Sequence, residues 1–218
     1  MARTTVPLPT LRRIPRYLRL AEELLSQGIV HVSSAELAER LGFTPSQVRQ
    51  DFSALKEVLG ISADGQQGYG YRTDSLRGNM ERIMKLSEEK TCVWIGIGNL
   101  AMALARNFDF KRCGIRPAAA FDILPQKVGT SLSTLSGAIP IFHVDTLEAY
   151  CLRERPQTAI LTCPPFSAQN IADILSRTGV LGIWNLTNVD IRVPDGVVLE
   201  SLHLSDSLMT LASRIPVL

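Results

Sequence analysis

The stretch Thr91-Cys-Val-Trp-Ile-Gly-Ile-Gly-Asn-Leu-Ala-Met-Ala-Leu104 decides the fold of this 218-residue chain. Its apolar first part is typical of a buried parallel strand, and the small and apolar residues after the glycines are typical of a helix. Gly96 would allow a tight turn, Gly98 would leave room for a pyrophosphate, and Ala101 would let the helix pack close to the strand. Such a turn also occurs for packing reasons alone, so the motif by itself is weak evidence for a dinucleotide site.

An acidic residue follows this motif at a spacing typical of a ribose contact. Residues 117–122 are predicted to form the next strand, which ends at Asp122. The acid that binds the adenosine ribose is expected roughly 20 residues after the glycines, although an aspartate at a strand end can equally cap a helix or a turn. We favour a dinucleotide site, with the phosphates at the helix N-terminus on Asn99 and Leu100. Because an acid repels a 2′-phosphate, we expect NAD rather than NADP.

Composition and charge are those of a soluble globular protein. Hydrophobic residues make up 45% of the chain and the net charge is +2. No apolar run approaches the roughly 20 residues of a membrane span, and the N-terminus has no apolar signal core. We therefore expect a cytoplasmic protein that does not contact a membrane. The four cysteines form no C-x-x-C pair and have no histidine at ligand spacing, so we expect no metal site.

The N-terminal third is predicted to be a winged helix. An amphipathic helix runs from Pro15 to a glycine cap at Gly28, and a capping box begins a second helix at residues 35–41. A glycine turn then leads to a third helix at residues 45–59, which has proline at its first position. Two short helices joined by a turn containing glycine are typical of a helix-turn-helix. The glycine-rich residues 64–71 predict a β-hairpin wing.

This third of the chain has the charges and side chains of a DNA-binding domain. Residues 1–20 carry five arginines and no acid, a basic arm that suits a phosphate backbone, although a solvated helix face has the same composition. Arginine pairs with guanine edges and glutamine with adenine. A protein-binding helical module is the alternative, but the arm and wing together favour DNA. The candidate DNA-binding residues are Arg12, Arg13, Ser46, Gln47, Arg49, Gln50, Ser53, Gln67 and Tyr69.

The rest of the chain is predicted to complete a doubly wound parallel sheet. Short strands at residues 140–142, 158–162, 180–186 and 197–200 alternate with helices. Ligands of such sheets bind beyond the carboxyl ends of the strands, which adds Lys127, Thr162, Cys163, Pro164 and Asn185 to the candidate cofactor-binding residues. The predicted domains are a winged helix at 1–78, a linker helix at 79–90, a Rossmann domain at 91–200 and a terminal helix at 201–218.

Taken in order, these motifs resemble those of the Rex family, bacterial repressors that sense the NADH/NAD ratio. The likeness is carried by residues 13–17, 47–51, 65–71, 96–100, 121–122 with 127–129, 161–164 with 168–169, and 182–185. The resemblance implies an α/β Rossmann domain that binds NADH and NAD⁺, joined to an N-terminal α+β winged helix. It implies a homodimer with swapped terminal helices that binds a palindromic operator in double-stranded DNA. It also implies that NADH releases the operator and that no hydride is transferred.

The chain departs from the family pattern at several positions. Ala101 replaces a third glycine, and Leu124 stands where the family often has a second acid. Asn107 replaces a tyrosine, and His203 replaces an acid near the start of the terminal helix. In the family, that tyrosine and acid join an arginine, here Arg19, in a network that changes with the bound nicotinamide. These three switch candidates cannot remake an arginine–carboxylate pair, so the coupling to DNA is expected to be weakened or altered.

The sequence therefore predicts a DNA-binding transcriptional repressor that senses the NADH/NAD ratio and is not an enzyme. A regulator that answers a different ligand remains an alternative, because it fits the changes at Asn107 and His203. A small NAD-dependent oxidoreductase is a further alternative. No paired acid and base near the expected nicotinamide position requires such an activity, and we expect no catalytic residues.

Overall fold

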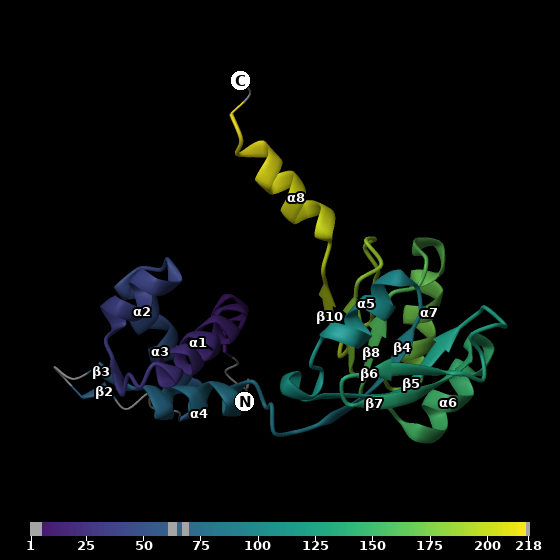
Figure 1. Ribbon diagram of the computed structural model, residues 1–218, viewed down its shortest axis with the longest axis horizontal. Helices are drawn as coiled ribbons and strands as arrows, with labels where there is room; N and C mark the ends of the chain where they lie inside the picture. The colour runs from purple at the N-terminus through teal and green to yellow at the C-terminus, as the bar shows by residue number, and fades with distance from the viewer. Residues whose placement is uncertain (1–5, 61–64, 67–69, 217–218) are drawn as a thin grey trace. The chain divides into compact units, whose positions relative to one another are not determined.

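The computed structural model describes residues 6–60, 65–66 and 70–216 of the chain. They form two compact units, Met1–Ser87 and Glu88–Leu218 (Figure 1). In the described ranges, no helix is both long enough and apolar enough to cross a membrane.

The first unit is a helical head with a small sheet. Its elements are α1 (Leu8–Ser26), β1 (His31–Val32), α2 (Ser34–Leu41), α3 (Pro45–Leu59), β2 (Gly65–Gln66), β3 (Gly70–Arg72) and α4 (Thr73–Ile83). The three strands pair antiparallel in the order β1-β3-β2. The predicted helix-turn-helix is α2 and α3, and the predicted hairpin is β2 and β3, so both predictions are confirmed.

Local sequence explains the ends of α2 and α3. The side chains of Ser33 and Thr44 accept hydrogen bonds from the backbone N–H groups three residues further on, at 3.0 and 3.1 Å. Gly42 and Gly60 end the two helices in the left-handed conformation, with φ of 67° and 63°. These caps satisfy backbone groups that a helix end leaves without partners.

Helix α1 is longer than the sequence predicted. It begins at Leu8 and continues through Pro15, although proline removes one helical hydrogen bond. Thr10 and Ile14, in this first part of the helix, are buried in the head. The stretch expected to be an arm before the helix is therefore largely the first half of α1.

Helix α4 also differs from the predicted linker helix at 79–90. It spans Thr73–Ile83, and its buried Leu76 and Met80 belong to the same core cluster as the buried face of α1. Because this apolar face is buried within the first unit, α4 is part of the head. The chain divides into its two compact units between Ser87 and Glu88, after this helix has ended.

A buried carboxylate joins α3 to α1. Asp51 accepts hydrogen bonds from Thr10 at 2.9 Å, from Tyr17 at 2.8 Å, and from two guanidinium nitrogens of Arg13 at 2.7 and 2.6 Å. Burial raises the pKa of Asp51, but the hydrogen bonds from Arg13, Tyr17 and Thr10 outweigh it, so this pKa lies below its usual 3.8. The bidentate, charge-assisted pair fixes the orientation of α3 on α1.

We predict that Asp51→Asn lowers the free energy of unfolding of the head by about 2 kcal/mol or more, because Arg13 would lose its charged partner. Hydrogen exchange of the α1 and α3 amides measures this loss. The folded-state pKa of Asp51 is depressed, so its contribution is present above the unfolded-state pKa and is lost as pH falls through the folded-state pKa. The difference in free energy of unfolding between the variant and the wild type should therefore become smaller below about pH 3.8.

Asp74→Asn is the matched control. It removes the solvent-exposed ion pair between Arg72 and Asp74, which is expected to leave exchange in α1 and α3 unchanged. Equal effects of the two substitutions would contradict a specific role for the buried carboxylate.

The second unit is built on a seven-stranded sheet. Its elements are β4 (Lys90–Ile95), α5 (Asn99–Asn107), β5 (Ile115–Asp122), β6 (Ser131–Thr134), β7 (Gly137–His143), α6 (Leu147–Glu154), β8 (Thr158–Leu161), α7 (Pro165–Arg177), β9 (Gly182–Asn185), β10 (Val198–Ser201) and α8 (Leu204–Ser213), with short 3-10 turns at Lys111–Cys113 and Val144–Thr146. The strand order is β10-β9-β8-β4-β5-β7-β6, and all pairs are parallel except β6 with β7. The parallel strands follow the doubly wound order of dinucleotide-binding folds, which confirms the predicted fold class.

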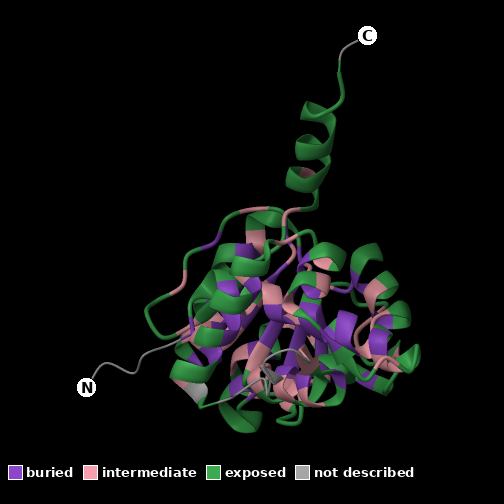
Figure 2. Ribbon diagram, turned by 90° about the vertical axis from the view of Figure 1, so that its left-hand side faces the viewer, coloured by how far each residue is buried: buried purple, intermediate pink, exposed green. Residues whose placement is uncertain are grey.

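The central strand is apolar because helices cover both faces of the sheet. Val93 and Ile95 lie in a core cluster with buried residues of α6 and α7, whereas Cys92 and Trp94 lie in a second cluster with buried residues of α5. Successive side chains of β4 point to opposite faces of the sheet, so this one strand contributes to both cores. In Figure 2 the buried colour is concentrated in the interior, and α8 is exposed along nearly its whole length.

One strand was not anticipated. Residues 140–142 were predicted as a short third strand, but β7 is longer and forms a hairpin with β6 at the sheet edge. Leu132 is the buried residue of β6, and the flanking serines and threonine gave no strand pattern that periodicity could detect.

Candidate functional site

A cavity of about 790 Å³ lies at the carboxyl ends of β4, β5 and β8. This is the crevice in which doubly wound sheets bind ligands, and the volume is within the range of small-molecule sites. Asn99 and Leu100 are exposed at the start of α5 and do not line it. The predicted cofactor-binding residues that do line it are Gly96, Gly98, Asp122, Lys127, Thr162, Cys163 and Pro164.

The two glycines of the turn are required for different reasons. Gly96 has φ of +88°, and a Cβ there would lie 2.5 Å from the backbone of Cys163, so packing within the protein requires glycine. Gly98 has φ of −86°, which any residue can adopt, and a Cβ there would meet no protein atom within 4 Å. Because Gly98 lines the cavity, its missing side chain leaves space for an occupant.

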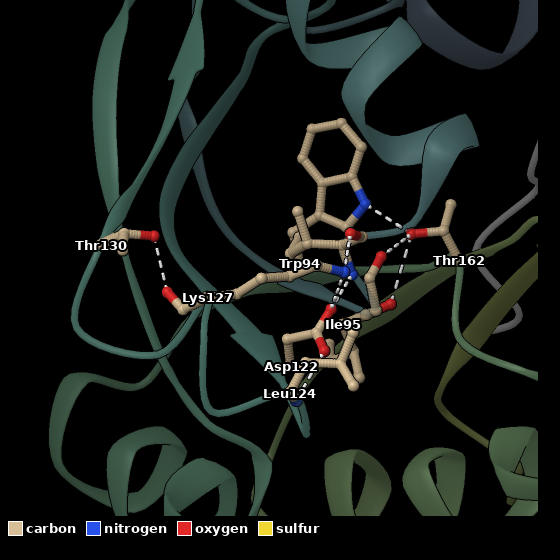
Figure 3. Close-up of polar contacts among 9 residues, drawn as sticks. Trp94, Ile95, Asp122, Leu124, Lys127, Thr130 and Thr162 are labelled. Atoms are coloured by element: carbon tan, nitrogen blue, oxygen red, sulfur yellow. Dashed lines mark hydrogen bonds and ion pairs between the residues drawn. The ribbon is translucent and has the colours of Figure 1, made fainter.

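Asp122 holds the glycine turn in place. Its Oδ2 accepts the backbone N–H of Ile97 at 2.8 Å, and its Oδ1 accepts that of Leu124 at 2.9 Å. Lys127 Nζ lies 3.2 Å from Oδ2 (Figure 3). Burial raises the pKa of Asp122, but the hydrogen bonds from Leu124, Ile97 and Lys127 outweigh it and keep this pKa below its usual value. The carboxylate predicted to bind ribose therefore already has three protein partners and would have to share its lone pairs with a ligand.

Two further side chains brace the same turn. Thr162 Oγ1 donates to the carbonyl of Gly96 at 2.6 Å and accepts the indole N–H of Trp94 at 2.8 Å (Figure 3). Lys127 Nζ donates to the carbonyl of Ile97 at 2.6 Å. Trp94 was not among the predicted site residues. The N–H of an indole in a buried strand needs a hydrogen-bond acceptor, and this requirement was the signal in the sequence that could have linked Trp94 to the site.

Asn185 does not line the cavity. Its side chain is fully buried, donates to the carbonyl of Val189 at 2.7 Å and to Ser201 Oγ at 3.2 Å, and accepts from the N–H and hydroxyl of Thr187. The structure thus corrects the expectation that this amide faces the crevice. Its hydrogen bonds organise the loop after β9.

Much of the predicted DNA-binding face lies on the surface of the head. Arg12 is exposed on α1. Helix α3 presents a polar surface of the kind that reads base edges and phosphates. The exposed residues on this surface are Ser46, Arg49, Gln50 and Ser53.

Two predicted DNA contacts are turned toward the protein instead. Arg13 forms the bidentate pair with Asp51, and Gln47 Nε2 lies 3.4 Å from the same carboxylate. The contact of Arg13 with Asp51 anchors α3 on α1, and direct contact of both residues with DNA stays a prediction. Gln67 and Tyr69, predicted at the tip of the wing, lie outside the described residues.

The three switch candidates have separate surroundings. Arg19 is exposed on α1 of the head, and Asn107 at the end of α5 hydrogen-bonds to the backbone of its own helix at 2.8 Å. His203 precedes α8, where its ring nitrogens lie 3.8 Å from Asp190 and 3.5 Å from Asp206. An acidic environment therefore persists at the start of α8, although position 203 itself lacks a carboxylate.

The cysteines are free thiols. Cys92, Cys151 and Cys163 are buried and Cys113 is exposed. Burial raises the pKa of Cys92 to about 12 and that of Cys151 to about 11, which makes them poor nucleophiles. Across the ranges that the structure describes, no group of three or more histidine, cysteine, aspartate or glutamate side chains could hold a metal ion.

A winged helix-turn-helix and a doubly wound domain with a cavity at its glycine turn define a class of protein, the DNA-binding regulators that respond to a nucleotide. Residues 5–53 match a family model described as a putative DNA-binding protein N-terminus, and residues 87–189 match one described as a CoA binding domain.

Relatives that match nearly the whole chain identify the family more specifically than these two models do. The redox-sensing transcriptional repressors Rex of Caldicellulosiruptor saccharolyticus and Clostridium tetani are 41% and 40% identical to this chain, over 96% and 95% of its length and 91% and 93% of theirs. Crystal structures of RSP in complex with β-NAD⁺ and operator DNA, and with β-NADH, have TM-scores of 0.86 and 0.83 at 38% and 36% identity. Each match covers 96% of this chain, and 92% and 93% of those chains.

The chain belongs to the Rex family of redox-sensing transcriptional repressors. The predicted family and regulatory function are confirmed, and the relatives are named as repressors and not as enzymes.

We predict unequal stability effects for alanine at the two glycines. Gly96→Ala should lower the free energy of unfolding of the second unit by about 2 kcal/mol or more, because it combines positive-φ strain with a clash against Cys163. Gly98→Ala should change it by less than about 0.5 kcal/mol, because the added methyl enters open space. Urea unfolding measures both, and similar losses would contradict the distinction between a packing glycine and a ligand-facing glycine.

Proposed function

We propose that this chain binds operator DNA through its head and that NADH, bound at the glycine turn of the second unit, releases the operator. Gly98 is the observation that carries the nucleotide half of the proposal. Its backbone conformation does not require glycine and no protein atom occupies the space beside it, so the glycine is explained by a ligand that approaches the backbone.

The diphosphate would lie against the turn and the start of α5. Backbone N–H groups of Asn99 and Leu100 belong to the first turn of that helix, where unpaired donors and the helix dipole favour an anion. This placement uses backbone groups, so it does not depend on side chains that line the cavity. A Cβ at residue 98 would occupy the diphosphate space, and Gly98→Ala should therefore weaken dinucleotide binding without unfolding the protein.

The adenosine ribose would lie beside Asp122 and Lys127. The carboxylate disfavours a 2′-phosphate, whereas the ammonium group 3.2 Å away offsets part of that repulsion. We expect NAD(H) to bind in preference to NADP(H), with a smaller margin than a lone carboxylate would provide.

On the head, the exposed residues of α3 supply the base and phosphate contacts. Arg49 is suited to a bidentate contact with guanine, and Gln50 to adenine, while Ser46, Ser53 and Arg12 suit phosphates. Arg13 and Gln47 support this surface through Asp51. The operator-bound structure of RSP supports DNA as the partner. A two-fold dimer of such heads would bind a palindromic site. We expect the protein to act in the cytoplasm.

Helix α8 supports a homodimer. It has no buried residue, and three of its leucines recur along one face, opposite Ser213. A soluble monomer seldom exposes a continuous apolar stripe of this kind, so a second copy is expected to cover it. We infer that each α8 packs on the partner subunit. The stripe consists of Leu204, Leu208 and Leu211.

We predict that Leu208→Glu converts the dimer to a monomer in size-exclusion chromatography with light scattering and weakens operator binding at least tenfold, because one head alone forms half of the contacts. Ser213→Glu places the same charge on the opposite face and should preserve the dimer. A wild-type chain that is monomeric at the same concentration would contradict the assignment of α8.

A changed response to NADH remains a second candidate function. Arg19, Asn107 and His203 cannot form the arginine–carboxylate pair that the family resemblance implies. The match of residues 87–189 to a CoA binding domain also makes CoA a ligand to exclude. A regulator that has drifted to another nucleotide would retain the glycine turn and the head.

Titration of NADH, NAD⁺, NADPH and CoA into an operator mobility-shift assay tests the proposal. We predict that NADH releases the operator and that NAD⁺ does so at least tenfold less effectively, because only a ligand that prefers one dimer conformation can shift the equilibrium. Release by CoA but not by NADH would favour the drifted regulator.

Arg49→Ala separates the two sites in the same assay. It should weaken operator binding by tenfold or more, a typical loss for one bidentate base contact, while NADH affinity measured by calorimetry stays unchanged. Loss of both activities would count against independent DNA and nucleotide sites.

A further inference from the structure

Three large apolar side chains stand exposed around the same cavity. Ile123 is 66% exposed, Leu124 38% and Phe166 90%, and all three line the cavity that contains the glycine turn. Single exposed apolar residues are ordinary, but a group around one cavity indicates a contact surface. Phe166 is the most exposed large apolar residue in the described part of the chain.

The backbone at Phe166 is held firmly while its ring remains free. Phe166 is the second residue of α7 and follows Pro164 and Pro165, whose rings restrict the chain. The N–H and the hydroxyl of Ser167 both donate to the carbonyl of Pro164, at 3.0 and 2.9 Å. Because the backbone is already fixed, a flat ligand that stacks on the ring has to order only its side-chain torsions.

The lining of the cavity indicates which half of a dinucleotide it receives. Besides the glycine turn and the start of α7, the lining comes from the loop after β5 and from Val144, Asp145 and Glu148, which follow β7. Strands β4, β5 and β7 form the first half of the doubly wound sheet, and the acid at the end of its second strand marks the adenosine ribose. No residue beyond Ile174 is among the described residues that line the cavity, so the base at this end is adenine.

We propose that Phe166 stacks on the adenine of the bound dinucleotide and that Ile123 and Leu124 complete an uncharged wall around the base. This inference rests on the proposed function, because it assigns residues within the same site. A phenyl ring has a π face and no hydrogen-bonding group, so it contributes base affinity through stacking and apolar contact. Leu124 keeps the wall free of the second acid that the family often has at this position.

Stacking of Phe166 on adenine does not distinguish the two redox forms of the dinucleotide. Adenine is chemically identical in NADH and NAD⁺, so a contact with it strengthens both complexes by the same factor. Phe166 therefore sets the total dinucleotide concentration to which the protein responds. Discrimination between the two redox forms must come from groups near the nicotinamide.

Calorimetry on the full-length wild type, Phe166→Ala and Phe166→Trp tests the assignment with NADH, NAD⁺ and ADP-ribose, which lacks nicotinamide. We expect Phe166→Ala to weaken all three ligands by about tenfold, as for the loss of one aromatic stack on a base. Phe166→Trp should retain the affinity, and fluorescence of its added indole should change when ADP-ribose binds. Thermal unfolding of the free alanine variant should match wild type, because the ring is exposed.

Leu152→Ala is the matched control, because Leu152 on α6 is also an exposed large apolar residue but does not line the cavity. It should leave all three affinities unchanged.

Unchanged NADH affinity in Phe166→Ala overturns the proposal. So does a loss for NADH without a loss for ADP-ribose, which would place the ring at the nicotinamide end. Conversion of Phe166→Ala to a monomer in light scattering would assign the ring to the partner subunit. A wild type that binds neither NADH nor ADP-ribose refutes the proposed function itself, a result distinct from the selective effects of the substitution.

Discussion

The nucleotide site depends on the carboxylate of Asp122, which joins the ends of β4 and β5. One oxygen accepts the backbone N–H of Ile97, within the glycine turn, and the other accepts that of Leu124, at the start of the next loop. Without these bonds, the backbone N–H of Ile97 would be unpaired in a buried region and that of Leu124 in a partly buried one. The cavity at the turn and the apolar residues beside it are therefore placed by one side chain.

The head likewise depends on a hydrogen-bonded carboxylate. Asp51 on α3 is buried, and three side chains of α1 donate to it. In both units a carboxylate is desolvated, and its hydrogen bonds keep its pKa low, so it remains ionised and positions neighbouring elements. Asp51 and Asp122 could be taken for residues that contact a ligand. Their hydrogen bonds to the protein instead position the elements that carry the binding surfaces.

The departures from the family pattern concern coupling more than binding. Nothing at Asn107 or His203 obstructs the glycine turn, and neither residue lines the cavity. Two carboxylates, of Asp190 and Asp206, lie within 4 Å of His203, so the start of α8 keeps acidic groups in a changed arrangement. We therefore expect that binding of a dinucleotide and transmission of that event to DNA are separable properties of this chain.

Sequence alone determined the fold class, the glycine turn, the helix-turn-helix with its caps, and the family, because these follow from local patterns and short spacings. Tertiary structure decided which polar groups remain available. Arg13, Gln47, Asp122 and Asn185 all have side chains suited to ligands. Arg13 and Asp122 meet partners distant in sequence, Asn185 is enclosed by a folded loop, and Gln47 lies beside Asp51 on its own helix. A polar side chain that is buried must satisfy its hydrogen bonds within the protein, and sequence spacing does not reveal which ones are buried.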